Sequence, residues 1–311
     1  MSLVAAVATT LLRRDDPMKY DPELCTFETC DIEWSFYRYR PSLAANATLT
    51  ALFAISLIAY AIQGVMSKRF YGFSIAMVLG TICECLGYVG RIMMWNNPWK
   101  EVPFMIQICC LTIGPAFLAA GIYFCLSRIV TTFGRENSRL GPLWYPRIFI
   151  PCDVLSLALQ GAGGGIASTA VAGTSAADLG KNIMIAGLVS QVVTLGAFII
   201  LAIDFSLRTL RRMKSMGEGA LDPRHAALRR SFAFRGFLVA LSVATLLIFT
   251  RCVYRIAELS GGWDGHLMKD EPLFIALEGG LIVAAVFALN LFNPGLCFRE
   301  GYDKTLSEEM K

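Results

Sequence analysis

Charged residues and histidines are scarce in this sequence. Of its 311 residues 17% are charged and only two are histidines, whereas soluble domains carry roughly 25% charged residues. Neither Cys83 and Cys85 nor Cys109 and Cys110 have the spacing of a zinc site. A GxxxxGK[ST] motif for nucleotide phosphates is absent as well. We therefore expect no metal, no cofactor and no direct nucleotide hydrolysis.

Further absences narrow the class of protein. No Ser/His/Asp set lies within sequence reach, because the two histidines fall in predicted loops on opposite sides of the apolar segments. We therefore expect no enzyme. The alternation of apolar and polar residues that marks the strands of a membrane barrel is also missing. The net charge is only +4, and we expect no nucleic-acid partner.

Long apolar segments dominate the chain, since 55% of its residues are hydrophobic. A helix that crosses a bilayer needs about 20 predominantly apolar residues. The qualifying segments are Ala45–Met66, Phe70–Trp95, Val102–Val130, Ile148–Ser168, Ile183–Phe205, Gly236–Glu258 and Leu273–Phe292. We therefore predict an all-α, polytopic membrane protein with seven transmembrane helices in one bundle. Residues 45–298 would form this domain, preceded by a segment at 1–44 and followed by a tail at 299–311.

Lysine and arginine are distributed unevenly between these segments. If the N-terminus lies outside, the three outer loops contain only Lys100, Lys181 and Lys269. The inner loops and the tail then contain Lys68, Arg69, Arg135, Arg139, Arg147, Arg208, Arg211, Arg212, Lys214, Arg224, Arg229, Arg230, Arg235, Arg299, Lys304 and Lys311. This asymmetry follows the positive-inside rule. It predicts an extracellular N-terminal segment and a cytoplasmic tail. We interpret the longest inner loop as an anchor, with binding of anionic lipid as the alternative.

The N-terminal segment carries three features of its own. Asn46-Ala-Thr48 is a glycosylation acceptor pattern, which is usable only on the outer side. Cys25 and Cys30 lie in a polar external stretch where a disulfide is permitted, with two free thiols as the alternative. Leu3–Leu12 is either a short cleaved leader or part of an external tail.

Six charged residues lie inside the apolar segments, in what would be the outer half of the membrane. They are Glu84, Arg91, Arg251, Arg255, Glu258 and Glu278. At roughly 3 kcal/mol each, six unpaired charges facing lipid would cost on the order of 18 kcal/mol, more than a typical folding stability. We therefore expect pairing between helices, Glu84 with Arg251 or Arg255, and Arg91 with Glu278 or Glu258. Such pairs would form either a structural lock or the wall of a binding pocket.

Polar residues also recur along single helix faces. Asp153 and Gln160 share a face because residues three, four and seven apart do so, and Gln191 occupies the next segment. Since lipid cannot satisfy such a stripe, we expect it to face the interior of the bundle. Asp153 has no basic neighbour on its own face and would be protonated, pair with Arg128 or Arg147, anchor the helix entry after Pro151, or contact substrate.

Two further patterns predict local backbone geometry. Gly114-Pro115 should kink the third segment, because proline removes one hydrogen bond of the helix. Gly161-Ala-Gly-Gly-Gly165 contains a GxxxG pattern that permits close approach of another helix. We interpret both as packing devices, with a hinge as the alternative.

Several stretches taken together resemble the fungal lipid-translocating exporter family. They are Glu84-x-x-Gly87-Tyr88-x-x-Arg91, Pro115-Ala-Phe-x-Ala-Ala-x-x-Tyr123, Asp153-x-x-Ser156-x-x-x-Gln160-x-x-Gly163, Gly187-x-x-x-Gln191, Arg251-x-x-Tyr254-Arg255-x-x-Glu258, Glu278 and Asn293-Pro294-Gly295. The resemblance implies seven spans, an external glycosylated N-terminus, a plasma-membrane location and stress- or drug-linked movement of lipid. Asn293 departs from the histidine expected at the last motif.

We therefore hypothesise a transporter or flippase that moves an amphipathic lipid, such as a sphingoid long-chain base, toward the outer leaflet. Its partners would be membrane lipids and this small-molecule substrate, while its oligomeric state stays open. Glu84 and Glu278 would receive the amine. The remaining substrate-binding candidates are Tyr88, Arg91, Asp153, Gln160, Gln191, Arg251, Tyr254, Arg255 and Glu258. Without a nucleotide motif, movement would be downhill or coupled to protons or another ion.

A receptor or lipid sensor is the alternative. Seven segments, an external N-terminus and Asn293-Pro294 near the end of the last segment are also typical of G-protein-coupled receptors. Against this reading, the third segment ends in Leu126-Ser-Arg128 rather than in an acid, arginine and tyrosine. The outer loop Thr169–Lys181 also has no cysteine that would bridge to the third segment.

Overall fold

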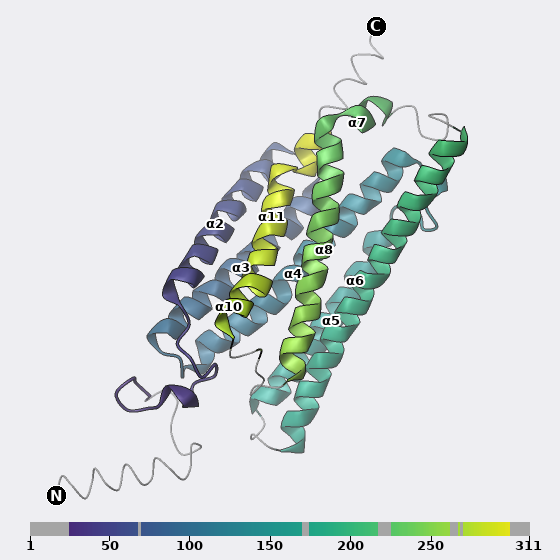
Figure 1. Ribbon diagram of the computed structural model, residues 1–311. Coiled ribbons are helices and arrows are strands. Elements are labelled where there is room, and N and C mark those ends of the chain that lie inside the picture. Colours follow the sequence, from purple (N-terminus) through teal and green to yellow (C-terminus); the bar gives the residue numbers. More distant parts are fainter. Residues whose placement is uncertain are drawn as a thin grey trace, which may run out of the picture.

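The computed structural model describes residues 25–67, 70–169, 174–216, 225–261, 267 and 270–298 (Figure 1). Three predictions from the sequence concern, wholly or in part, residues outside these ranges. The leader at Leu3–Leu12 and the tail at 299–311 lie outside the described residues, as do residues 1–24 of the N-terminal segment.

The described chain is all-helical. The long helices are α2 (Leu43–Met66), α3 (Tyr71–Asn96), α4 (Glu101–Phe133), α5 (Trp144–Thr169), α6 (Ser175–Met216) and α8 (Phe232–Ser260). The last span combines α10 (Glu271–Phe274), the π-helical η7 (Ile275–Gly280) and α11 (Leu281–Leu291). Short helices are η3 (Ile32–Trp34), η4 (Arg135–Asn137) and α7 (Ala226–Arg230). Seven helical stretches are long and apolar enough to cross a membrane, which confirms the all-α, seven-span prediction.

The observed helices extend beyond the predicted apolar segments. α6 is the clearest case, since its 42 residues include Asp178 and Lys214 in its end turns. At 1.5 Å per residue it is roughly 60 Å long, about twice the thickness of the hydrocarbon core. Hydropathy marks only the part of a helix that suits lipid, whereas backbone hydrogen bonding continues into polar turns.

Neighbours in sequence are mostly neighbours in space. α3 packs along α2 and α4, α5 along α6, and α8 along α11. The ring closes because α11 also contacts α2, and α6 contacts α8. α4 contacts α3, α5, α6 and α8, and 56% of its apolar window is buried, the highest share of the seven. α4 is therefore the central helix of the bundle.

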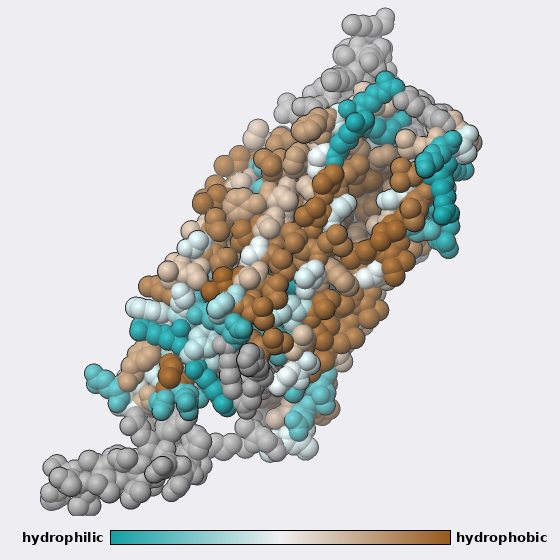
Figure 2. All heavy atoms as spheres, viewed as in Figure 1, coloured by the Kyte–Doolittle hydropathy of each residue, from teal (hydrophilic) through white to brown (hydrophobic). Residues whose placement is uncertain are grey.

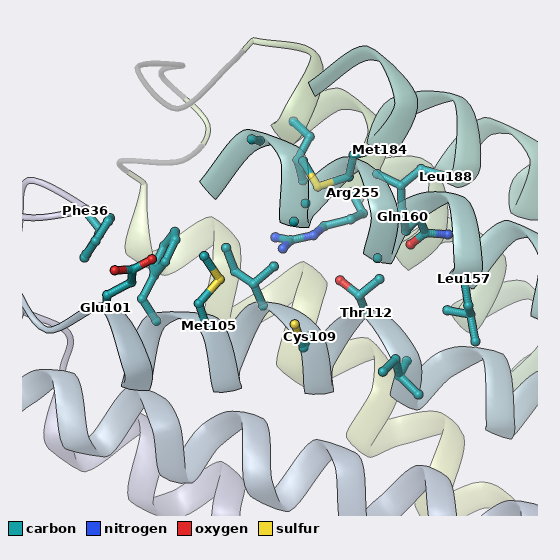
Figure 3. A pocket seen from close by; sticks show the side chains of 18 residues that line it. Phe36, Glu101, Met105, Cys109, Thr112, Leu157, Gln160, Met184, Leu188 and Arg255 are labelled. Carbon is teal, nitrogen blue, oxygen red and sulfur yellow. The ribbon is translucent and has the colours of Figure 1, made fainter. Parts of the chain in front are cut away.

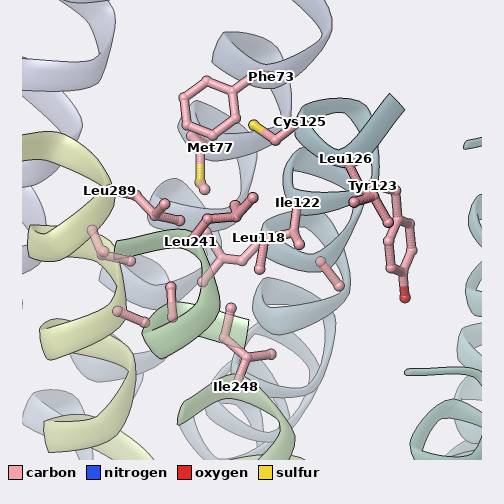
Figure 4. Close-up of a cluster of buried hydrophobic side chains, with 14 of the residues drawn as sticks. Phe73, Met77, Leu118, Ile122, Tyr123, Cys125, Leu126, Leu241, Ile248 and Leu289 are labelled. Carbon is pink, nitrogen blue, oxygen red and sulfur yellow. The ribbon is translucent and has the colours of Figure 1, made fainter. Parts of the chain in front are cut away.

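The largest part of the core is an apolar cluster that several helices share (Figure 4). Phe73 and Met77 come from α3, Leu118 and Ile122 from α4, and Leu289 from α11, and all five are at most 1% exposed. The surface is also apolar between two polar ends, as the face in Figure 2 shows. On α2 the exposed side chains include Ile55, Ile58, Ile62 and Val65, as expected for a helix that faces lipid.

The two ends of the bundle differ (Figure 1). The end that carries η3 is called the η3 end here, and the end that carries η4 and α7 the α7 end. Residues 25–42 fold over the turn between α3 and α4. Asn97 donates to the carbonyl of Cys25 at 3.1 Å, and the guanidinium of Arg40 lies 4.0 Å from the ring centre of Trp95. Part of the predicted N-terminal segment is therefore a folded cap on the η3 end.

Candidate functional site

The six charged residues predicted inside the spans form a charged cluster in the half of the bundle nearest the η3 end. The cluster comprises Glu84, Arg91, Arg251, Arg255, Glu258 and Glu278. Each of them is at most 2% exposed. The structure therefore turns all six charges away from lipid, as expected from their insertion cost.

Arg251 connects three elements at the centre of this cluster. Its Nη2 donates to Oε1 of Glu278 on η7 and to the carbonyl of Leu111 on α4. In a regular helix the Leu111 carbonyl would accept from the residue four positions later, which is Pro115 and has no N–H. The arginine of α8 thus takes the place of the hydrogen bond that the proline removes.

The π-helical stretch η7 presents Glu278 to Arg251. At its end the Leu281 N–H donates to the carbonyl of Ala276, five positions back. Single π-helical turns inside longer helices occur frequently at functional sites. Gly279 follows Glu278 in η7, and a Cβ placed on Gly279 would lie 2.9 Å from the Tyr88 hydroxyl of α3. The π-helical stretch therefore packs closely on α3.

Glu84 does not make the ion pair predicted from the sequence. Arg251 binds Glu278 instead, and Nη1 of Arg255 lies 2.5 Å from Oε2 of Glu258, three residues away on the same helix. Both carboxylate oxygens of Glu84 lack a hydrogen-bond partner in the described part of the protein. One of them fills the space beside Gly114, where a Cβ would lie only 2.6 Å away.

Arg91 also differs from its predicted pairing with Glu278 or Glu258. Its Nη2 donates to the Tyr39 hydroxyl at 2.5 Å and lies 3.7 Å from Oε1 of Glu271. The guanidinium lies 3.9 Å from the ring centre of Phe274, within the range of a cation–π contact. Burial raises the pKa of Tyr39, although Arg91 acts in the opposite sense.

The sequence analysis missed this aromatic environment of Arg91. Tyr39 precedes the first span, and Glu271 and Phe274 open the last one, so their distance in sequence hid the contact. The signal available was the aromatic stretch Phe36–Tyr39 in an otherwise polar segment. The cap and the last span therefore cover the cluster at the η3 end.

Several polar atoms near the cluster have no hydrogen-bond partner among the described residues. They include the hydroxyls of Tyr88 and Tyr254, both amide atoms of Gln107, Nε of Arg251 and Oε2 of Glu278. Gln107 lies on α4 and was not among the predicted site residues, although it is the only amide side chain in its segment. Unpartnered buried polar atoms are rare and cost about 1–3 kcal/mol each. Such a concentration indicates a place where water or a polar ligand group binds.

The polar residues of α5 and α6 form a second group. Gln160 Nε2 donates to Gln191 Oε1 at 3.1 Å, so the predicted inward stripe meets across these two helices. Asp153 lies nearer the α7 end and accepts from the Tyr123 hydroxyl at 2.9 Å. The sequence offered Arg128 or Arg147 as one alternative for this partner, and the observed hydrogen bond to Tyr123 agrees with another, the anchor of the helix entry.

The glycine-rich stretch of α5 packs differently from the GxxxG interpretation. A Cβ on Gly163 would lie 2.4 Å from the Met184 nitrogen, and one on Gly180 2.6 Å from the Ala167 nitrogen, so these glycines permit the close contact of α5 with α6. Gly161 and Gly165, the residues of the motif itself, have no atom within 4 Å of a Cβ position. The motif pair thus faces open space rather than a helix.

That open space belongs to a cavity of about 450 Å³ between α4, α5, α6 and α8, called the α4–α5 cavity here (Figure 3). Gln160 and Arg255 line it, and they are the only predicted site residues that do. The other five members of the charged cluster do not line it. Arg255 is therefore the residue that the charged cluster and the cavity share.

Two predictions for the N-terminal segment have different outcomes. Cys25 and Cys30 are joined in a disulfide with Cα atoms 5.5 Å apart, packed against Trp99. Asn46 is fully buried in the first turns of α2, and its Nδ2 donates to the Ser42 carbonyl at 2.6 Å. Because this nitrogen would carry the glycan, the folded protein does not present Asn46 as an acceptor, and the glycosylation prediction holds only if Asn46 is modified before α2 packs.

Comparison with known proteins places the chain in a family. The model of the RTA1 like protein family matches residues 77–301, well over half of the chain. The chain belongs to the RTA1-like family. The matched region contains all six residues of the charged cluster, together with Gln160 and Gln191. No solved structure matches the chain.

Three relatives of this RTA1-like protein come from Saccharomyces cerevisiae. The sphingoid long-chain base transporter RSB1 (strain Lalvin EC1118) is 34% identical over 281 residues, which covers 83% of this chain and 73% of the relative. Protein RTM1 is 28% identical, covering 84% and 92%. Protoporphyrin uptake protein 1 (strain ATCC 204508 / S288c) is 26% identical, covering 88% and 96%. The resemblance inferred from the motifs is thus confirmed at the level of the family.

Proposed function

We propose that this RTA1-like protein transports an amphipathic lipid of the sphingoid long-chain base class toward the outer leaflet. The single observation that carries the proposal is the 34% identity, over 83% of the chain, to a protein named as a transporter of such bases. Seven membrane-length helices around buried polar groups support it. Export of a toxic base would also confer resistance to that base. None of the three relatives is named as a receptor, so the receptor alternative gains no support.

The proposed topology has residues 1–44 outside, the bundle at residues 45–298 in the plasma membrane and residues 299–311 in the cytoplasm. The uneven distribution of lysine and arginine supports this orientation. The η3 end would then face outward, and the charged cluster would lie in the outer leaflet. A substrate that enters near Asp153 would pass Gln160 and Gln191 on its way to this end.

Glu84 is the carboxylate that we assign to the substrate amine. In the described structure Glu278 is bound to Arg251, Glu258 to Arg255, and Glu271 accepts from the Ser42 N–H at 2.6 Å. Glu84 has no such partner. An ammonium group beside Glu84 would satisfy a buried carboxylate that protein groups leave unpaired.

The experiment is export of a labelled long-chain base from cells that lack their own exporters. Glu84→Gln removes the negative charge at nearly constant shape, and we expect export to fall at least about ten-fold at equal surface expression. Glu136→Gln is the matched control, because the Glu136 side chain is 85% exposed at the α7 end. Full export by Glu84→Gln would contradict the role of Glu84, and no export by the unmodified protein would contradict the proposed function.

A further inference from the structure

A second cavity, of about 480 Å³, lies between α4, α6 and α8 in the half of the bundle nearest the α7 end, and it is called the α6–α8 groove here. Figure 2 shows the surface hollowed between α8 and α6, with hydrophilic residues at the upper end of each helix. We propose that this groove binds an anionic phospholipid, with an acyl chain in the groove and the head group at the α7 end. None of the described residues that line it is a predicted substrate-binding residue, so the proposal goes beyond the proposed function.

The walls of the groove are apolar apart from four hydroxyls. Ser206, Thr209, Ser242 and Thr245 each donate to the backbone carbonyl four residues earlier in their own helix. Within the described part of the chain, no side chain that lines the groove is charged or has a buried polar atom without a hydrogen-bond partner. The groove therefore suits a hydrocarbon chain, whereas the unpartnered atoms of the charged cluster call for polar groups.

The groove is open toward the membrane. Ile203, Leu207 and Leu210 on α6 and Leu246 on α8 all line it, and each residue is between 49% and 56% exposed. Both helices are long and apolar enough to cross a membrane. A lipid chain can therefore enter the groove sideways from the bilayer.

The length of the groove matches one leaflet. On α8 it extends from Leu238 to Leu246, and Arg235 lies about one turn beyond Leu238 toward the α7 end. At 1.5 Å per residue, the rise from Arg235 to Leu246 is roughly 17 Å. One leaflet contributes about half of the roughly 30 Å hydrocarbon core. A chain that fills the groove therefore places its head group at the level of Arg235.

Two basic residues share the helix faces that line the groove. Arg235 precedes Leu238 by three positions and Ser242 by seven, and Lys214 follows Leu210 by four, so each lies on the lining face of its own helix. Both residues are exposed. Lys214 makes no hydrogen bond or ion pair with the described residues. The positive-inside rule accounts for basic residues at this end of the bundle but not for their position on these two faces.

A third positive charge lies at the end of α4, the helix between the other two. Arg229 of α7 donates to the carbonyl of Thr132 at 3.1 Å, and the next residue, Phe133, lines the groove. Each helix that bounds the groove thus has a basic residue at its α7 end. Lysine and arginine near a membrane surface attract anionic lipids, so we assign an anionic rather than a zwitterionic head group.

The first test compares head groups and charges. Native mass spectrometry of the delipidated full-length protein should show that dioleoyl phosphatidylserine binds at least about ten-fold more tightly than dioleoyl phosphatidylcholine. Lys214→Gln/Arg235→Gln should weaken binding of phosphatidylserine at least about ten-fold, because each basic residue near the surface contributes about five-fold. Binding of phosphatidylcholine should not change. Equal affinity of the unmodified protein for the two lipids would overturn the proposal.

Arg211→Gln is the matched control for charge. Arg211 is also exposed near the end of α6, but it lies about 100° around the helix from Leu210 and does not line the groove. Its replacement should leave the affinity for phosphatidylserine within about two-fold. A loss as large as that of the double variant would show that only the total charge matters, and it would overturn the site.

The second test fills the groove. Ser242→Phe places a ring on an exposed residue that lines it, and Val239→Phe places the same ring on an exposed residue of α8 that does not. Binding of phosphatidylserine should weaken at least about ten-fold for Ser242→Phe and stay unchanged for Val239→Phe. Equal affinity of the two variants would overturn the site.

A third test uses the unmodified protein. Phosphatidylserine with a photoreactive diazirine near the end of one chain should label peptides within residues 198–213 and 238–246 at least about five-fold more than the phosphatidylcholine analogue does. Equal labelling would overturn the proposal even if Ser242→Phe failed to fold. Saturating sphinganine should leave the labelling unchanged, and its loss would assign the groove to the substrate instead. None of these measurements requires export of a base, so the site and the proposed function fail separately.

Discussion

Gly114 shows how one absent side chain shapes the charged cluster. Its α-carbon lies on the central helix beside the carboxylate of Glu84, and a Cβ at this position would come within 2.6 Å of Oε1 and 3.2 Å of the carboxyl carbon. The contact involves the end of a side chain that has little room to move, because Glu84 is 1% exposed. The glycine is therefore required by the neighbouring acid rather than by the backbone conformation.

This contact leads to a prediction for stability. Gly114→Ala should lower the free energy of unfolding by about 1–3 kcal/mol, the usual cost of overpacking a buried site, despite the higher helix propensity of alanine. Gly121→Ala is the control on the same helix, because its Cβ would meet its nearest neighbours at 3.4 Å. Thermal unfolding in detergent measures both variants. Equal unfolding temperatures of the two would show that Glu84 does not occupy this space.

At the scale of elements, α4 depends on two other helices at its proline. Pro115 leaves the Leu111 carbonyl without its helical donor, Arg251 of α8 supplies one, and Glu278 of η7 holds that arginine. The three groups form one unit. Removal of the arginine would leave both a buried carboxylate and a buried carbonyl without a partner, which is more costly than losing a hydrogen bond between exposed groups.

The unit predicts strong coupling between its members. Arg251→Met should destabilise the protein by about 3–5 kcal/mol, because a buried charge is left uncompensated. The double variant Arg251→Met/Glu278→Leu should cost clearly less than the sum of the single changes. Adding Pro115→Ala to the double variant should restore part of the stability, since the alanine N–H can donate to Leu111. Unfolding by denaturant measures the cycle, and additive effects would contradict the unit.

At the scale of the whole molecule, the proposed orientation in the membrane is inferred from the uneven distribution of lysine and arginine, and it can be tested directly. We expect an engineered Asn-x-Thr acceptor on a flexible insertion in the α5–α6 connection, residues 170–173, to be glycosylated. The same insertion in the inner connection, residues 217–224, should remain unmodified. Sensitivity to an endoglycosidase reports the result. Glycosylation of only the second insertion would reverse the proposed topology.

The unmodified protein is the control for this experiment. It should show no shift after endoglycosidase treatment, because Asn46 is buried and its amide nitrogen is bonded to Ser42. A shift that disappears in Asn46→Gln would show that the acceptor is modified before α2 packs, and it would confirm the prediction from the sequence.

The sequence by itself determined the seven helices, the family and the burial of the six charges. Each of these depends on one residue or one segment at a time, because the cost of placing a charge or an apolar side chain in lipid is a local quantity that sums along the chain. The same reasoning correctly placed Gln160 and Gln191 toward the interior. It could not assign partners, since the predicted pairings for Glu84 and Arg91 were wrong and the tyrosine partner of Asp153 was not foreseen.

Only the tertiary structure decided which groups meet. Partner choice depends on the rotation and depth of each helix, and these are set by contacts distant in sequence, such as Gly163 against Met184 and Gly114 against Glu84. Pro115 leaves the Leu111 carbonyl of α4 without a helical donor, and the fold brings Arg251 close enough to donate to it. The same arginine also binds Glu278. The α4–α5 cavity arises in the same way, because a hollow forms where glycines of one helix face no neighbour, which no pattern within one segment reveals.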